Sequence, residues 1–199
     1  MVIEEGCRSL MLCISDLHHA ESALDLISKR TSGDKQEEAR DTVEKILQDV
    51  QIEGDKALVR YTKRFDGFNP DPITIDPDIL IEAWERTPKK LKEALQLAHQ
   101  RIKDFHQCQI PPDLLLTGID GETLGRRWRP VQKAGIYIPG GRASYPSTVL
   151  MNAIPAQVAG VEKVLMVSPA GPKGEVNKVV LAAAHLVGVS QVFRIGGAQ

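Results

Sequence analysis

The chain has 199 residues, 42% hydrophobic and 26% charged, with a formal net charge of −1, which is ordinary for a soluble globular protein. Near-neutral charge gives no electrostatic reason to expect nucleic acid or an anionic membrane as a partner. No apolar run approaches the ~20 residues that a membrane span needs, and the first residues lack the apolar core of a signal peptide, so we expect a cytoplasmic protein.

The first 129 residues are predicted to be mainly helical, with a few strands. Apolar residues recur at helical spacing through 36–51, and a shorter helix follows between Gly54 and the Asp66-Gly67 turn. A short strand is expected at 73–75, before a helix that starts at Asp76. A long amphipathic helix follows, and its apolar face is expected to carry Leu91, Leu95, Ala98, Ile102 and Phe105.

From residue 113 onward the pattern changes from helices to strands. Two apolar stretches joined across Asp120-Gly121 predict a hairpin. A strand at 135–138, a helix at 147–159 with Ser147 as its N-cap, a second strand and helix, and a last strand from 191 follow. This alternation predicts a parallel sheet with right-handed crossovers.

A parallel sheet of about three strands has too few elements packed on it to form a stable domain. The sequence is therefore expected to stop in the middle of a fold. In that case the apolar residues of the last strand region would each have one uncovered face, namely Val192, Phe193 and Ile195.

The Gly140-Gly141 turn lies between a strand and a helix start, and two interpretations of it stay open. Glycines let a ligand approach the backbone, and a helix start offers free N–H groups to an anion, so the stretch resembles a nucleotide phosphate site. However, the sequences GxGxxG and GxxxxGK[ST] are both absent. The alternative is a turn that needs glycine for its geometry alone.

Neither the cysteines nor the histidines form a recognised catalytic or metal-binding pattern. With no CxxC pair, free thiols are expected at Cys7, Cys13 and Cys108. Adjacent histidines seldom share a metal, and the other histidines lack the i, i+4 spacing of a helical metal pair. We therefore expect solvated or structural side chains at His18, His19, His99, His106 and His185.

Four stretches of this chain closely resemble histidinol dehydrogenase. They are "GIYIPGG", "PSTVLMNAIPAQVAGV" and "RIGGAQ", in this order, and upstream "EGDKALVRYTKRFDG". The resemblance covers nearly the whole chain and is strongest from Val131 onward. With the strand and helix pattern, it implies an α/β protein with a helical N-terminal region at 1–129. The first half of an incomplete Rossmann-like, parallel NAD-binding domain is then expected at 130–199.

The resemblance also implies an activity. Members of this family are zinc-dependent homodimers of histidine biosynthesis that oxidise L-histidinol to L-histidine through the aldehyde, using NAD. Their NAD contacts map onto Tyr137 and Gln199. A third NAD contact, the glutamate–histidine catalytic pair and the zinc ligands map beyond Gln199, so we expect no catalytic or metal-binding residue here and no activity of this chain alone. The alternatives are a related dehydrogenase of another polar alcohol and a non-catalytic fragment.

Overall fold

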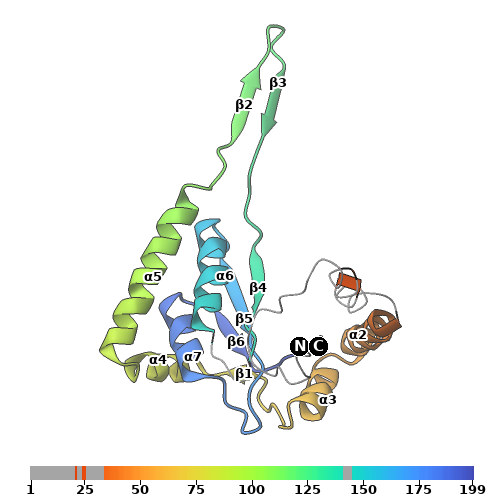
Figure 1. The fold of residues 1–199 in the computed structure, drawn as a ribbon. Coiled ribbons are helices and arrows are strands. Elements are labelled where there is room, and N and C mark those ends of the chain that lie inside the picture. Colours follow the sequence, from red (N-terminus) through yellow and green to blue (C-terminus); the bar gives the residue numbers. More distant parts are fainter. Residues whose placement is uncertain (1–20, 22–23, 26–33, 141–144) are drawn as a thin grey trace, which may run out of the picture. The chain divides into compact units, whose positions relative to one another are not determined.

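A computed structural model describes residues 21, 24–25, 34–140 and 145–199 (Figure 1). The chain divides into two compact units, Met1–Ile46 and Leu47–Gln199. Several residues discussed above lie outside the described residues, namely Cys7, Cys13, His18, His19 and Gly141. None of the helices in the described residues combines the length and the apolar character needed to cross a membrane.

The helices of the N-terminal part follow the expected order, and local signals explain where they begin. They are α2 (Asp34–Glu53), α3 (Asp55–Phe65), α4 (Pro77–Glu85) and α5 (Lys89–Gln107). Gly54 separates α2 from α3 with a positive φ of 58°, a conformation that costs glycine little. At the start of α4, the Asp76 carboxylate accepts a hydrogen bond of 2.9 Å from the backbone N–H of Asp78, so Asp76 is the N-cap.

The main sheet combines three parallel strands with one antiparallel strand at its edge. Its strands are β1 (Thr74–Ile75), β4 (Lys133–Tyr137), β5 (Lys163–Val167) and β6 (Gln191–Phe193), in the order β1-β6-β5-β4. Helices α6 (Pro146–Val158) and α7 (Lys178–Leu186) connect the parallel strands. The α/β class is confirmed, and β1 adds an antiparallel edge that the sequence pattern did not predict.

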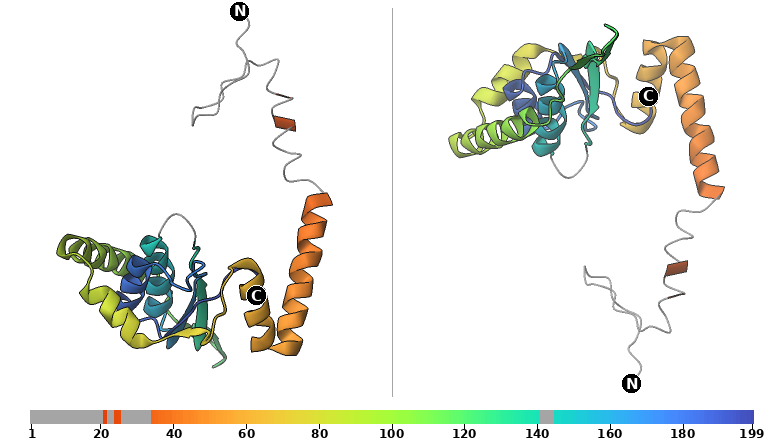
Figure 2. Two further views of the ribbon diagram at one scale, coloured as in Figure 1. Left: turned by 90° about the horizontal axis from the view of Figure 1, so that it is seen from below. Right: turned by 90° about the horizontal axis from the view of Figure 1, so that it is seen from above.

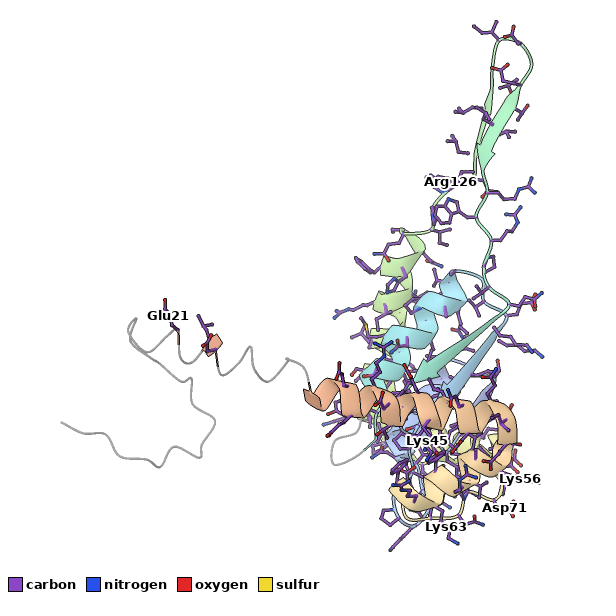
Figure 3. All side chains as sticks on the ribbon, turned by 90° about the vertical axis from the view of Figure 1, so that its right-hand side faces the viewer. Glu21, Lys45, Lys56, Lys63, Asp71 and Arg126 are labelled. Atoms are coloured by element: carbon purple, nitrogen blue, oxygen red, sulfur yellow. The ribbon has the colours of Figure 1, made fainter. Side chains whose placement is uncertain are left out.

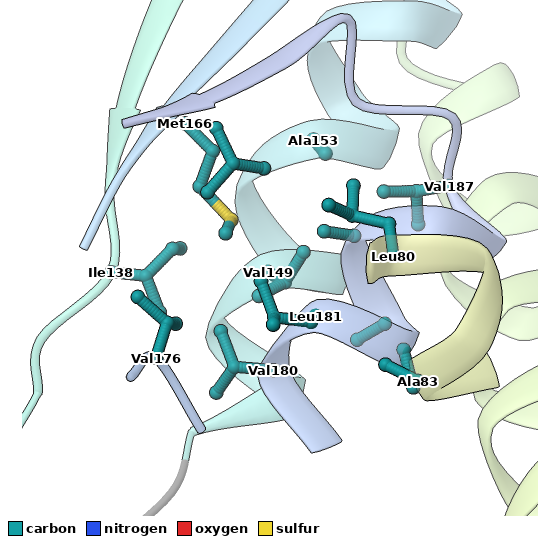
Figure 4. Close-up of a cluster of buried hydrophobic side chains, with 14 of the residues drawn as sticks. Leu80, Ala83, Ile138, Val149, Ala153, Met166, Val176, Val180, Leu181 and Val187 are labelled. Carbon is teal, nitrogen blue, oxygen red and sulfur yellow. The ribbon is translucent and has the colours of Figure 1, made fainter. Parts of the chain in front are cut away.

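The core lies between the sheet and the helices α4 to α7, which share one side of it (Figures 1 and 2). Alternate strand residues point to this side, and Met166 and Val192 are almost completely buried there. Figure 4 shows Met166 among side chains from α6, α7 and α4, including Val149 and Leu181. The opposite face of the sheet carries the intervening residues, such as Tyr137 and Val167.

Three details of the sequence interpretation are wrong. Ser147 is not the N-cap of α6, because the helix begins at Pro146 and the cap position is Tyr145; proline is favoured at the first helical position. Phe105 is 62% exposed although it shares a helical face with Leu95. In the last strand region Val192 and Ile195 are buried and Phe193 is partly exposed.

The predicted hairpin forms a separate two-stranded sheet of β2 (Leu114–Thr117) and β3 (Thr123–Arg126). Gly121 takes a φ of 85° in the connecting turn. Figure 3 shows the hairpin, with Arg126 labelled, extending away from the helices and the main sheet. The division of the chain into domains at residues 129 and 130 stays a prediction.

Candidate functional site

The carboxyl ends of the parallel strands form one edge of the main sheet. Tyr137, Val167 and Phe193 are aligned across that edge as the last residues of β4, β5 and β6. In open α/β sheets, ligands bind in the crevice outside the carboxyl ends of the strands. This edge is therefore the candidate functional site.

Two glycines bring the loops of this edge close together. A Cβ atom on Gly140 would lie 2.7 Å from Cγ of Pro169, and one on Gly196 would lie 2.5 Å from Cβ of Pro169. Both distances are shorter than real Cβ contacts, so neither position accepts a side chain without a shift. The loop after β5 thus packs against the loops after β4 and β6. Gly140 therefore has a packing requirement.

Tyr137 presents its side chain at the end of β4. Its neighbours Ile136 and Ile138 are buried, whereas Tyr137 is 50% exposed. The backbone N–H of Ile138 donates a 2.8 Å hydrogen bond to the carbonyl oxygen of Val167, which holds this end of the strand in place. The Tyr137 ring is consequently held on a fixed backbone and is open to a ligand, with an apolar face and a polar hydroxyl.

Gln199 lies six residues beyond β6, on the segment that leaves the same sheet edge. Its side chain folds back over Gly197, where a Cβ atom would lie 2.5 Å from Oε1 of Gln199. Both Nε2 and Oε1 of Gln199 are buried and have no hydrogen-bond partner. Buried polar groups are nearly always hydrogen-bonded, so this amide has an unused donor and an unused acceptor.

Two further unpartnered polar atoms lie at the end of α3. The hydroxyl oxygen of Thr62 and Oδ2 of Asp66 are buried without a hydrogen-bond partner, and burial raises the pKa of the Asp66 carboxyl. The end of the chain lies beside α3 (Figures 1 and 2). The sequence analysis missed both residues, because it treated Asp66 only as the end of a helix. An acidic residue in such a turn was the signal available.

No group of three or more His, Cys, Asp or Glu side chains that could hold a metal occurs among the described residues. Burial lowers the pKa of His99, and the nearby Lys103 lowers it further. The ring of His185 lies beside Trp84, with 6.1 Å between the ring centroids, and Nδ1 of His106 is 2.7 Å from Oε1 of Gln109. Cys108 is exposed at the end of α5. His185 and His106 therefore have side-chain contacts within the folded chain.

This edge of the sheet is therefore suited to binding. Tyr137 places an exposed aromatic ring at this edge, and Gln199, on the segment that leaves it, has buried donor and acceptor atoms that have no partner in the folded chain. Such groups favour a ligand with a flat ring and several hydroxyl or amide groups. Tyr137 ends β4 and Gln199 follows β6 on the segment that leaves the same sheet. Their role as NAD contacts stays a prediction.

Comparison with known proteins shows the family to which this chain is similar. The family model "Histidinol dehydrogenase" matches residues 29–199. The histidinol dehydrogenase of Prochlorococcus marinus (strain MIT 9313) is 59% identical over 191 residues, and that of Thermosynechococcus vestitus is 43% identical over 192 residues. A crystal structure of histidinol dehydrogenase from Elizabethkingia anophelis superimposes with a TM-score of 0.77 at 34% identity.

The matched proteins are much longer than this chain. The alignments cover 96% of this chain but only 43% of the Prochlorococcus marinus protein and 44% of the Thermosynechococcus vestitus protein. The superposition covers 84% of this chain and 38% of the Elizabethkingia anophelis chain. The chain thus spans less than half the length of these relatives.

Proposed function

Because this chain belongs to the histidinol dehydrogenase family, we propose that it forms the N-terminal part of an enzyme of histidine biosynthesis. That enzyme oxidises L-histidinol to L-histidine through the aldehyde, with NAD as the oxidant. A homodimer and a cytoplasmic location belong to the same proposal. In this view residues 130–199 begin the NAD-binding domain, and residues 1–129 form the region that precedes it.

The unpartnered amide of Gln199 is the observation that carries the NAD site. Its buried donor and acceptor atoms lack a partner within the chain, and a nucleotide offers both kinds of group. Tyr137, half exposed at the end of β4, would stack against a base or a ribose. When bound, NAD supplies the hydride acceptor, and the contribution of this chain is to bind and orient it.

Zinc does not fit the described residues, because they contain no cluster of ligands for it. A catalytic zinc site generally needs three protein ligands and one open position. We therefore place the zinc ligands and the catalytic acid–base residues in the part of the family polypeptide that this chain does not include. The contribution proposed for the described residues is cofactor binding.

NAD binding to the 199-residue chain tests this proposal directly. Replacing Tyr137 with alanine removes a ring contact worth about 0.5–1.5 kcal/mol, which corresponds to a Kd that is roughly 2- to 13-fold weaker. Gln199→Ala should weaken binding by a similar factor, because a net hydrogen bond is worth about 0.5–1.5 kcal/mol. Saturation-transfer NMR titration would measure both effects.

Phe105→Ala is the matched control, because Phe105 is an exposed aromatic residue on α5, away from the sheet edge. It should leave the Kd unchanged, and Tyr137→Phe should retain most of the affinity because it keeps the ring. Equal NAD binding by the parent chain, Tyr137→Ala and Gln199→Ala would contradict the proposed site.

A further inference from the structure

The β2–β3 hairpin, residues 114–126, is called the arm. Every residue of its two strands is exposed, and it extends away from the rest of unit 47–199 (Figures 1 and 3). A single two-stranded hairpin is marginally stable at best in water. Exposure of a whole hairpin therefore raises the question of what covers it.

The arm has a defined geometry at its tip and at its base. At the tip, the Gly118 N–H donates to the Glu122 carbonyl oxygen at 2.8 Å, closing the turn. At the base, the Asp113 carboxylate accepts hydrogen bonds from the Trp128 backbone N–H at 2.7 Å and from the Arg129 guanidinium at 3.3 Å. These contacts hold the two strands in register, so the arm presents fixed surfaces.

The two faces of the arm differ in chemistry. Directly paired residues share a face, and residues two apart along a strand share it too. The pairs Leu116–Leu124 and Leu114–Arg126 thus form one face, called the leucine face, whose three leucines are 46–69% exposed. The other face carries one leucine, Leu115, which is 73% exposed and lies over Gly125, together with the pair Thr117–Thr123.

The size of the leucine face argues against a second arm as its cover. Full burial of a leucine is worth about 1.5–3 kcal/mol at about 25 cal/mol per Å², which corresponds to about 60–120 Å². Three leucines that are 46–69% exposed therefore offer about 100–200 Å² of apolar surface. A stable interface between separate proteins buries about 800 Å² on each partner. A segment of the same polypeptide needs far less area, because its effective concentration is already high.

Such a segment is available in the relatives. The match with the family includes the arm, and this chain covers only 43% of the Prochlorococcus marinus relative. In that relative, more than half of the polypeptide therefore lies outside the region that contains the arm. We propose that the leucine face of the arm is a docking surface for that further part of the histidinol dehydrogenase polypeptide, which covers Leu114, Leu116 and Leu124. The proposal depends on family membership and not on NAD binding.

A full-length chimera tests the contact by cross-linking. This chain replaces the matching region of the Prochlorococcus marinus enzyme, to which it is 59% identical, and the photo-reactive residue p-benzoylphenylalanine replaces Leu124. Mass spectrometry should identify cross-links to residues outside the region that matches this chain. Cross-links to the arm of another copy, or no more of them than with the probe at Thr123 on the opposite face, would overturn the proposal.

Co-expression as two chains gives a second measurement that does not require a folded chimera. The leucine face is expected to be one part of a larger interface between the two chains, so this chain should copurify with the remaining part of the Prochlorococcus marinus enzyme, and Leu124→Asp should reduce the yield of the complex at least tenfold. Thr123→Asp is the matched control, because it places the same charge on the adjacent residue of the other face and should leave the yield unchanged. Failure of the unsubstituted chains to copurify, or equal loss with both variants, would count against the docking surface. Neither measurement uses NAD, so a negative result for the docking surface is distinct from a negative result for the proposed cofactor site.

Discussion

Gly196→Ala tests whether the position after β6 requires a glycine because of close packing and not because of its backbone conformation. The added Cβ would lie 2.5 Å from Cβ of Pro169 and 3.3 Å from its Cα, and Gly196 is not among the glycines with positive φ. A proline ring has little freedom to move aside. Overpacking typically costs about 1–3 kcal/mol, while removing a glycine stabilises by about 0.4–1 kcal/mol through the unfolded chain. Taking the middle of each range, the expected net loss of unfolding free energy is about 1.3 kcal/mol.

Gly135→Ala is the matched control within the same sheet. No heavy atom lies within 4 Å of a Cβ built at Gly135, and its φ is also not positive. This variant should therefore gain the entropic stabilisation of about 0.4–1 kcal/mol without a clash. The two Gly→Ala changes are consequently expected to have opposite signs.

Urea unfolding followed by circular dichroism measures both changes. With an m-value of about 1–3 kcal/mol per M, the midpoints of the two variants should differ by about 1 M. The m-value should be the same for both, because the surface exposed on unfolding hardly changes. A midpoint for Gly196→Ala equal to that of the parent chain would refute the packing argument, and so would equal destabilisation by Gly135→Ala.

Other expected outcomes concern the core, the pH dependence and the activity. Met166→Ala should destabilise the chain by about 2–5 kcal/mol, because Met166 is fully buried, whereas Met151→Ala at a 55% exposed position should change little in the same urea assay. Burial raises the pKa of Asp66 above its ordinary 3.8, so its protonated form is favoured in the folded chain. Relative to Asp66→Asn, the parent chain should therefore lose stability as pH rises from 3 to 7. A difference in unfolding free energy between the two that stays constant with pH would contradict this. The 199-residue chain should produce no NADH from L-histidinol with NAD and zinc supplied, because the catalytic pair and the zinc ligands implied by the family resemblance map outside this chain. Zinc-dependent NADH formation, followed by the absorbance of NADH, would show the opposite.

Local sequence signals predicted part of the candidate site. The strand ending near Tyr137 and the glycine turn after it were recognisable from apolar runs and Gly-Gly pairs. The unpartnered atoms of Thr62 and Asp66 were not. The sequence does not show whether a hydroxyl or a carboxylate is buried or which groups can form hydrogen bonds with it. Whether it finds a partner depends on residues far away along the chain.

The sequence by itself determined the order of the elements and the family of the chain. Apolar runs, period-3.6 patterns, the helix start at Asp76 and the Asp120-Gly121 turn are local features, and they predicted the parallel strands, the helices and the hairpin. Tertiary structure alone decided that β1 pairs with β6 across more than a hundred residues, and that Gly140 and Gly196 both close on Pro169. It also decided that the leucine face of the arm stays exposed. The physical reason is that pairing, close approach and burial are properties of neighbours in space, which no local pattern specifies.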